Sequence, residues 1–223
     1  MMILIIGTLF IVSRGLQRTP LNILTAAKYT EVEYIPLVLN TPFTIIRTWG
    51  KEDLKQVHYY DDDKEYDYFN PVKQYSTNQD FKKQNVVIII LESFSEEYVG
   101  KLSHKESYTP FIDSLIDYSL CFKNAFANGK RSIEALPAIF ASIPTLMNNA
   151  YVSSGYAMNK INSLASILKE KGYNTAFFHG GMNGTMGFDD FTSVAGFNEY
   201  YVYNEYPDKT HYDGHWGIFD EEY

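Results

Sequence analysis

Residues 85–95 read Asn85-Val-Val-Ile-Ile-Ile-Leu-Glu92-Ser-Phe-Ser95, an apolar run of strand length that ends in a carboxylate. A run without polar alternation is typical of a strand buried on both faces, as in a parallel α/β sheet. Ligands of open α/β sheets bind at the carboxyl ends of strands, where Glu92 would stand. A carboxylate there is costly unless it is paired or binds a metal. Glu92 is therefore a candidate metal ligand, and a capping or salt-bridging glutamate is the alternative.

About forty residues later the chain reads Asn128-Gly-Lys-Arg-Ser132-Ile-Glu-Ala-Leu-Pro137, a glycine turn, two cations and a hydroxyl before an apolar helical pattern. The Ser132 hydroxyl could coordinate a metal or attack phosphorus, while Lys130 and Arg131 offset phosphate charge. Hard carboxylate and hydroxyl oxygens favour Mn²⁺ or Mg²⁺. The alternatives are that Ser132 is an ordinary helix cap and that one of the cations faces solvent.

Strands and helices are expected to alternate from Asn85 onward. The patterns predict strands over residues 86–91, 120–127 and 174–179, and helices over residues 109–118, 132–141, 163–171 and 188–195. Strands separated by helices of this length indicate βαβ units and an α/β fold with a mainly parallel sheet. The third strand ends at His179, again at the carboxyl edge of the sheet, where the ring could bind substrate or orient a ligand. A structural histidine is the alternative.

We expect Glu92 and Ser132 to share one cation. A strand end and a helix start at the same sheet edge would bring their oxygens within about 8 Å of each other, because metal–oxygen bonds are near 2.0–2.6 Å.

The composition excludes some partners. A formal net charge of −8 without a basic stripe argues against general nucleic-acid binding. An apolar content of 45% is enough for a globular core. The 19 tyrosines and 15 phenylalanines suit packing, with carbohydrate or lipid-interface contact as the alternative. Cys121 is the single cysteine, so an intrachain disulfide cannot form.

The chain is interpreted as three regions. Residues 1–12 are apolar and uncharged, too short to span a bilayer alone and without the basic start of a secretory signal. We interpret residues 1–19 as the end of a transmembrane helix, with a buried N-terminal helix as the alternative. Residues 20–80 would form a helix over 26–39, interrupted near Pro36 and lying along the membrane surface, followed by a polar linker. Residues 81–223 would be part of a catalytic domain.

The chain resembles the lipoteichoic acid synthase and phosphoglycerol transferase family, which is sulfatase-like and belongs to the alkaline phosphatase superfamily. The motifs that carry the resemblance are the run over 85–95, residues 129–132, Phe177-Phe-His-Gly-Gly181 and Asp213-Gly-His-Trp-Gly-Ile-Phe-Asp220. It implies an alkaline phosphatase-like sheet flanked by helices, and Mn²⁺ or Mg²⁺ bound by Glu92 and Ser132. It also implies that Ser132 replaces the family's usual threonine nucleophile.

The sequence departs from that family in two respects, and it also lacks the pattern of a classical sulfatase. The Asp-His pair that completes the family's metal site does not occur, so we expect an incomplete catalytic domain, missing its C-terminal half and inactive alone. Gly181, Met186 and Phe188 stand where the Gram-positive pattern has acidic, Trp and Arg head-group contacts. Neither Cys121 nor Ser132 is followed by the Pro and Arg of a formylglycine sulfatase, so classical sulfatase chemistry is disfavoured.

The resemblance therefore implies a membrane-anchored, metal-dependent transferase whose catalytic domain is extracytoplasmic. It would move phosphoglycerol, or a related phospho-alcohol, from a phospholipid donor to a glycan or polymer of the cell envelope through a phospho-serine intermediate. One alternative is a metal-dependent phosphatase or sulfatase-like hydrolase, which uses water as the acceptor. The other is an inactive fragment that binds membrane or a partner.

Overall fold

The computed structural model describes residues 5, 7–8, 22–51, 54–70, 72–76 and 80–223. The chain divides into two compact units, residues 1–54 with 128–223 and residues 55–127, which are described separately. The expected membrane segment over residues 1–19 lies outside the described residues, apart from Ile5, Gly7 and Thr8. In the described part of the chain, no helix combines the length and the apolar character needed to cross a bilayer.

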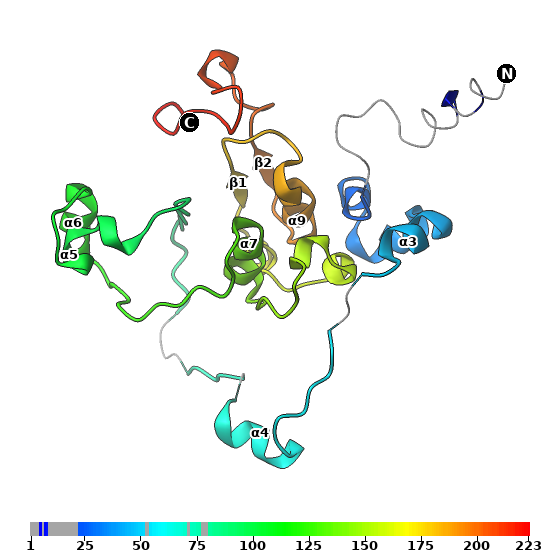
Figure 1. Cartoon of the computed structure of the whole chain (residues 1–223), viewed down its shortest axis with the longest axis horizontal. Coiled ribbons are helices and arrows are strands. Elements are labelled where there is room, and N and C mark those ends of the chain that lie inside the picture. The colour runs from blue at the N-terminus through cyan, green and yellow to red at the C-terminus, as the bar shows by residue number, and fades with distance from the viewer. Residues whose placement is uncertain (1–4, 6, 9–21, 52–53, 71, 77–79) are drawn as a thin grey trace. The chain divides into compact units, whose positions relative to one another are not determined.

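The first unit contains a small parallel sheet (Figure 1). Strands β1 (Ala176–Phe178) and β2 (Glu199–Tyr201) pair in parallel, with Phe177 opposite Tyr200. The rings of this pair stack with centroids 5.6 Å apart, the kind of cross-strand contact that stabilises a sheet. β1 confirms the strand expected over residues 174–179, and β2 was not predicted.

Three predicted helices of this unit are confirmed. They are α7 (Ser132–Ala141), α8 (Leu164–Glu170) and α9 (Phe188–Val194). Leu136 and Phe140, four residues apart on one face of α7, meet Phe177 and the apolar side of α9. The buried core they form consists of Leu24, Leu136, Phe140, Val152, Ala157, Phe177, Phe188, Phe191, Val194 and Ala195. Short 3-10 turns lie between these elements, namely η4 (Tyr151–Ser153), η5 (Gly155–Met158) and η6 (Thr185–Gly187), and η7 (Lys209–His211) follows β2.

The single interrupted helix expected over residues 26–39 is wrong. The chain instead forms η1 (Leu24–Lys28), η2 (Val32–Tyr34), α2 (Ile35–Val38) and α3 (Thr41–Thr48). Pro36 and Pro42 each stand in the first turn of a helix, where a missing backbone N–H removes no helical hydrogen bond. Inside one continuous helix either proline would break the hydrogen-bond ladder, so a new short helix begins at each of them. The Asn40 side chain accepts a hydrogen bond from the Phe43 amide and caps α3.

The second unit contains α4 (Asp62–Tyr68), η3 (Glu96–Tyr98), α5 (Gly100–Ser103) and α6 (Pro110–Ile116). α6 confirms the helix predicted over residues 109–118. α5 and α6 pack together, and the Lys101 amide donates to the Asp113 carboxylate at 2.9 Å.

The strands predicted over residues 86–91 and 120–127 are wrong, because neither segment pairs with another among the described residues. Their apolar side chains are exposed, with 82% of Val87 and 93% of Phe126 accessible. The physical reason is that a strand needs a neighbour for its backbone hydrogen bonds, and the described part of this unit offers none. The mainly parallel sheet of the expected α/β fold is therefore reduced here to two short strands.

Candidate functional site

Ser132 is the first residue of α7, as the sequence predicted. The preceding residue, Arg131, is extended at φ −127° and ψ 148° and forms the N-cap. The Ser132 side chain is therefore carried at the positive end of the helix, where first-turn amides and the helix dipole favour a bound anion. This position suits a hydroxyl that meets a phosphate group.

A buried carboxylate fixes the turn before Ser132. One oxygen of Glu134, Oε2, accepts from the amides of Lys130 at 2.8 Å and Arg131 at 3.1 Å. The other oxygen, Oε1, accepts from Nη2 and Nε of Arg131 at 2.6 and 3.0 Å. The hydrogen bonds from the Arg131 side chain and the Lys130 amide hold the pKa of Glu134 below its ordinary value, so the carboxylate stays ionised. Sequence reasoning missed this residue, although an acidic residue three places after a helix cap is a known capping signal.

Gly129 is required by the close approach of Glu134. A Cβ at residue 129 would stand 2.6 Å from the Glu134 Cβ and 3.0 Å from the Thr145 Oγ1. We expect Gly129→Ala to lower the free energy of unfolding by about 1–3 kcal/mol, because a packed neighbour must move. The measurement is urea unfolding of the 223-residue chain. Gly155→Ala is the matched control, because nothing lies within 4 Å of its added Cβ. Equal stability of the two variants would contradict this account of the turn.

The two cations beside Ser132 have different surroundings. The Arg131 guanidinium is bound to Glu134, and its Nη2 also donates to the Asn148 carbonyl at 3.2 Å. Arg131 therefore positions the start of α7. Lys130 is exposed and immediately precedes Arg131, which leaves it the better candidate for contact with phosphate. Both remain predicted phosphate contacts.

His179 directly follows β1 at the carboxyl edge of the sheet, as predicted. Its Nδ1 accepts from the Gly181 amide at 3.0 Å, and its ring packs edge-on against Phe188 with centroids 5.2 Å apart. A neutral ring that accepts at Nδ1 carries its proton on Nε2, so that nitrogen can donate to a substrate oxygen. Gly181 permits this arrangement, because a Cβ there would stand 2.8 Å from the ring nitrogen.

The loop over residues 212–218 lies beside His179. Ile218 donates its amide to the Gly180 carbonyl at 2.9 Å, and Tyr212 forms an isolated bridge with Ile218. The Asp213 carboxylate closes the loop by accepting hydrogen bonds from the backbone amides of residues 215, 216 and 217. These bonds, above all the one from His215, lower the pKa of Asp213 below its ordinary value. Trp216 is 76% exposed, so it projects from this loop and does not pack in the core.

Glu92 is exposed and belongs to the second unit, so its expected place at the end of a buried strand is wrong. Its Oε1 accepts from the Ser93 hydroxyl at 3.2 Å. The approach of Glu92 to Ser132 stays a prediction, because the two residues lie in different units.

Among the described residues, no group of three or more His, Cys, Asp or Glu could hold a metal. The carboxylate and hydroxyl suit Mn²⁺ or Mg²⁺, but two donors fall short of the three protein ligands usual for a catalytic metal.

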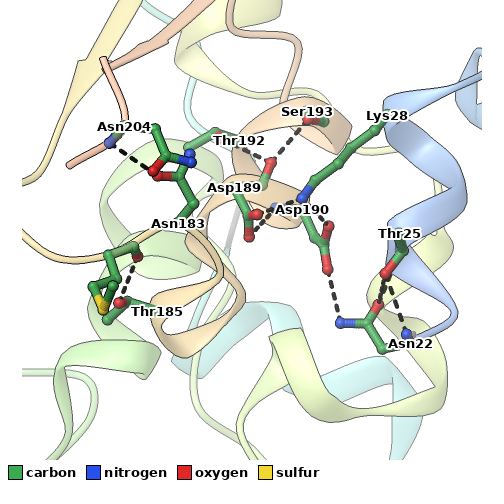
Figure 2. A network of polar contacts seen from close by, with 11 residues as sticks. Asn22, Thr25, Lys28, Asn183, Thr185, Asp189, Asp190, Thr192, Ser193 and Asn204 are labelled. Atoms are coloured by element: carbon green, nitrogen blue, oxygen red, sulfur yellow. Dashed lines mark hydrogen bonds and ion pairs between the residues drawn. The ribbon is translucent and has the colours of Figure 1, made fainter. Parts of the chain in front are cut away.

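A second polar cluster joins α9 to the N-terminal segment, and sequence reasoning missed it (Figure 2). Lys28 forms ion pairs with Asp189 and, at 3.3 Å, with Asp190, while the Asn22 side chain donates through Nδ2 to Asp190 at 2.7 Å. Burial and the neighbouring Asp189 charge raise the pKa of Asp190 above its ordinary value. Burial alone would lower the pKa of Lys28, but its hydrogen bond to Asp189 and the two carboxylate charges raise it overall. The cluster thus fixes residues 22–28 to the helix that follows the His179 loop.

Two comparisons with known proteins agree on the superfamily. Residues 84–223 match the profile of the family described as Sulfatase. The fold is similar to the crystal structure of a protein in the alkaline phosphatase superfamily from Vibrio parahaemolyticus, with a TM-score of 0.52 and 26% sequence identity. That match covers 58% of this chain but only 31% of the Vibrio chain. The structure therefore has an alkaline phosphatase-like α/β fold, with helices around a small parallel sheet.

Proposed function

The chain belongs to the sulfatase family, and from this premise we propose that it is part of a metal-dependent transferase that moves phosphoglycerol, or a related phospho-alcohol, between a phospholipid and a cell-envelope glycan or polymer. The proposed enzyme is anchored in the cell membrane with its catalytic domain outside the cytoplasm. The observation that carries the proposal is Ser132 at the start of α7, on a turn fixed by the buried Glu134 carboxylate.

In the first step, the Ser132 oxygen forms a bond to the phosphorus of the lipid head group. The bond from phosphorus to the diacylglycerol oxygen breaks, and that oxygen receives the proton that the serine hydroxyl gives up. In the second step, an acceptor hydroxyl attacks the phospho-serine, and its proton returns to the Ser132 oxygen. Water in place of that hydroxyl would make the enzyme a hydrolase.

Residues around Ser132 would stabilise the charge of the transferring group. The first-turn amides of α7 and the Lys130 ammonium would face the phosphate oxygens, and the Nε2 proton of His179 would donate to the substrate. Arg131 and Glu134 would keep the turn rigid, so that little reorganisation accompanies the reaction. A bound Mn²⁺ or Mg²⁺, with Glu92 and Ser132 among its ligands, would supply charge neutralisation and activation of the hydroxyl.

The test compares donors offered to the full-length enzyme. Fluorescent phosphatidylglycerol and phosphatidylethanolamine are supplied in vesicles with Mn²⁺, and the release of labelled diacylglycerol is measured. We expect release from one of these lipids and a head-group preference different from the Gram-positive pattern, because Met186 and Phe188 stand where that pattern has Trp and Arg. Hydrolysis of a soluble phosphomonoester without release from either lipid would favour the phosphatase alternative.

A further inference from the structure

The imidazole of His179 contacts two residues that follow it in the chain. Its Nδ1 accepts a hydrogen bond from the Gly181 amide at 3.0 Å. The ring also meets that of Phe188 nearly at a right angle, with the planes 82° apart and the centroids 5.2 Å apart. Phe188 is 3% exposed and packs against Phe177 of β1 as well, so it presents a fixed surface to the imidazole. The orientation of the His179 ring therefore depends on where Phe188 stands.

Phe188 is the first residue of α9, and the loop before this helix gives its start little support. Gly184, Met186 and Gly187 all have positive φ, and the value of 50° at Met186 is strained for a residue with a side chain. The N-cap is Gly187, which has no side chain to cap the helix. A helix of seven residues is also marginal by its own hydrogen bonds. Contacts from elsewhere must therefore hold the start of α9 in place.

The N-terminal segment supplies such contacts. Figure 2 shows the Lys28 ammonium reaching Asp189 and Asp190, the two residues that follow Phe188. Both carboxylates are buried, and the Asn22 side chain donates to Asp190 as well. Movement of the first turn of α9 away from this segment would leave buried charges without a partner, which is costly.

We propose that Lys28 is a positioning residue for His179. By pairing with the two carboxylates it holds Phe188 against the imidazole, and Phe188 in turn keeps Nδ1 at the Gly181 amide. The proton of the neutral ring then stays on Nε2, the nitrogen that would donate to substrate. The inference rests on the proposed function only for that substrate contact, because the coupling of Lys28 to the ring is a property of the fold.

The ring resonances of His179 test the coupling. The chain has five histidines, so labelling histidine alone with ¹⁵N and ¹³C gives few signals, and His179→Gln identifies those of His179. We expect Lys28→Met, measured where urea unfolding shows it to be folded, to shift the His179 ring protons, because Phe188 moves relative to them. The Nδ1 and Nε2 signals should also move closer together as the ring samples both tautomers. Lys28→Arg should keep the parent spectrum, since a guanidinium also pairs with carboxylates.

Lys160→Met is the matched control, because it removes another ion pair of the N-terminal segment, that with Glu33, which does not involve α9. It should leave the His179 signals unchanged. Phe188→Leu should change them with Lys28 in place, because the packed ring itself is gone. Unchanged His179 signals in Lys28→Met would overturn the proposal. The same change in Lys160→Met would also overturn it, because general loosening of the segment would then explain both.

Asn22→Ala takes the place of Lys28→Met if the latter does not fold. It removes one hydrogen bond from the cluster and keeps the cation, so it should move the His179 signals in the same direction by a smaller amount. A spectrum identical to that of the parent would then contradict the coupling.

An activity measurement separates the coupling from the proposed function. In the full-length enzyme, Lys28→Met should release labelled diacylglycerol about ten- to a hundredfold more slowly than the parent, the order of loss for a group misplaced by about 1 Å. Shifted His179 signals with an unchanged rate would show that the ring has no part in the reaction. The spectra do not depend on turnover, so a parent enzyme without transferase activity would contradict the proposed function while the spectra still decide the coupling.

Discussion

Transfer by the full-length enzyme is expected to fall at least about 10³-fold in kcat when Ser132 is replaced by alanine, because the attacking oxygen is removed. Ser132→Thr should keep measurable activity, since threonine offers the same hydroxyl and is the usual residue of the resembling family. Labelled diacylglycerol release measures both variants. Mass spectrometry of the enzyme mixed with donor lipid should find a phosphorylated Ser132 peptide in the parent and none in Ser132→Ala.

The alanine variant should fold normally. Ser132 is the first residue of α7 and the N-cap is Arg131, so alanine at residue 132 leaves the capping residue in place. Alanine is also the best helix former. An unchanged urea midpoint together with lost transfer would assign the effect to chemistry. Substantial transfer by Ser132→Ala would move the nucleophile elsewhere, and the proposed intermediate would be wrong.

Replacing Lys28 by methionine is expected to lower the free energy of unfolding by about 2–3 kcal/mol, because Asp189 and Asp190 would be left buried without their cation. The loss is smaller than the about 3–5 kcal/mol of a fully buried pair, because the Lys28 side chain is 37% exposed. Urea unfolding of the 223-residue chain gives the value. Lys160→Met is the matched control, and its loss should be smaller because both partners of the Lys160–Glu33 pair are exposed.

The pH dependence of this variant follows from the raised pKa of Asp190. A carboxyl group with a raised pKa in the folded state favours folding more as pH falls, because the folded protein binds the proton more readily. Lys28→Met should therefore recover stability between pH 7 and pH 5, and adding Asp190→Asn should restore part of it at pH 7. In the parent, the raised pKa of Lys28 means that the pair stabilises the fold below about pH 10.5 and is lost as pH rises through the folded value. A Lys28→Met loss that did not change with pH would show that packing, not charge, explains it.

The sequence predicted the local features well and the long-range ones poorly. α7 begins at Ser132 and α9 at Phe188 as expected, because glycine, capping and apolar spacing are local signals. The strand over residues 86–91 was expected because an apolar run indicates that a segment can be buried. Such a run does not show which other segment the strand would pair with. In the site, Ser132 and His179 stand at the helix start and strand end that their motifs indicated. The ion pairs of Lys28 were missed, because no pattern in one sequence links residues so far apart.

That separation bears on the order in which the protein forms during synthesis. Lys28 and Asp189 are 161 residues apart in the chain. At the usual rate of about 5–20 residues per second, a ribosome needs about 8–32 s to produce the second after the first. Throughout that interval Leu24, which is almost fully buried in the finished fold, lacks the helix against which it packs. The segment around Lys28 therefore waits for α9 before its ion pairs and its apolar packing can form.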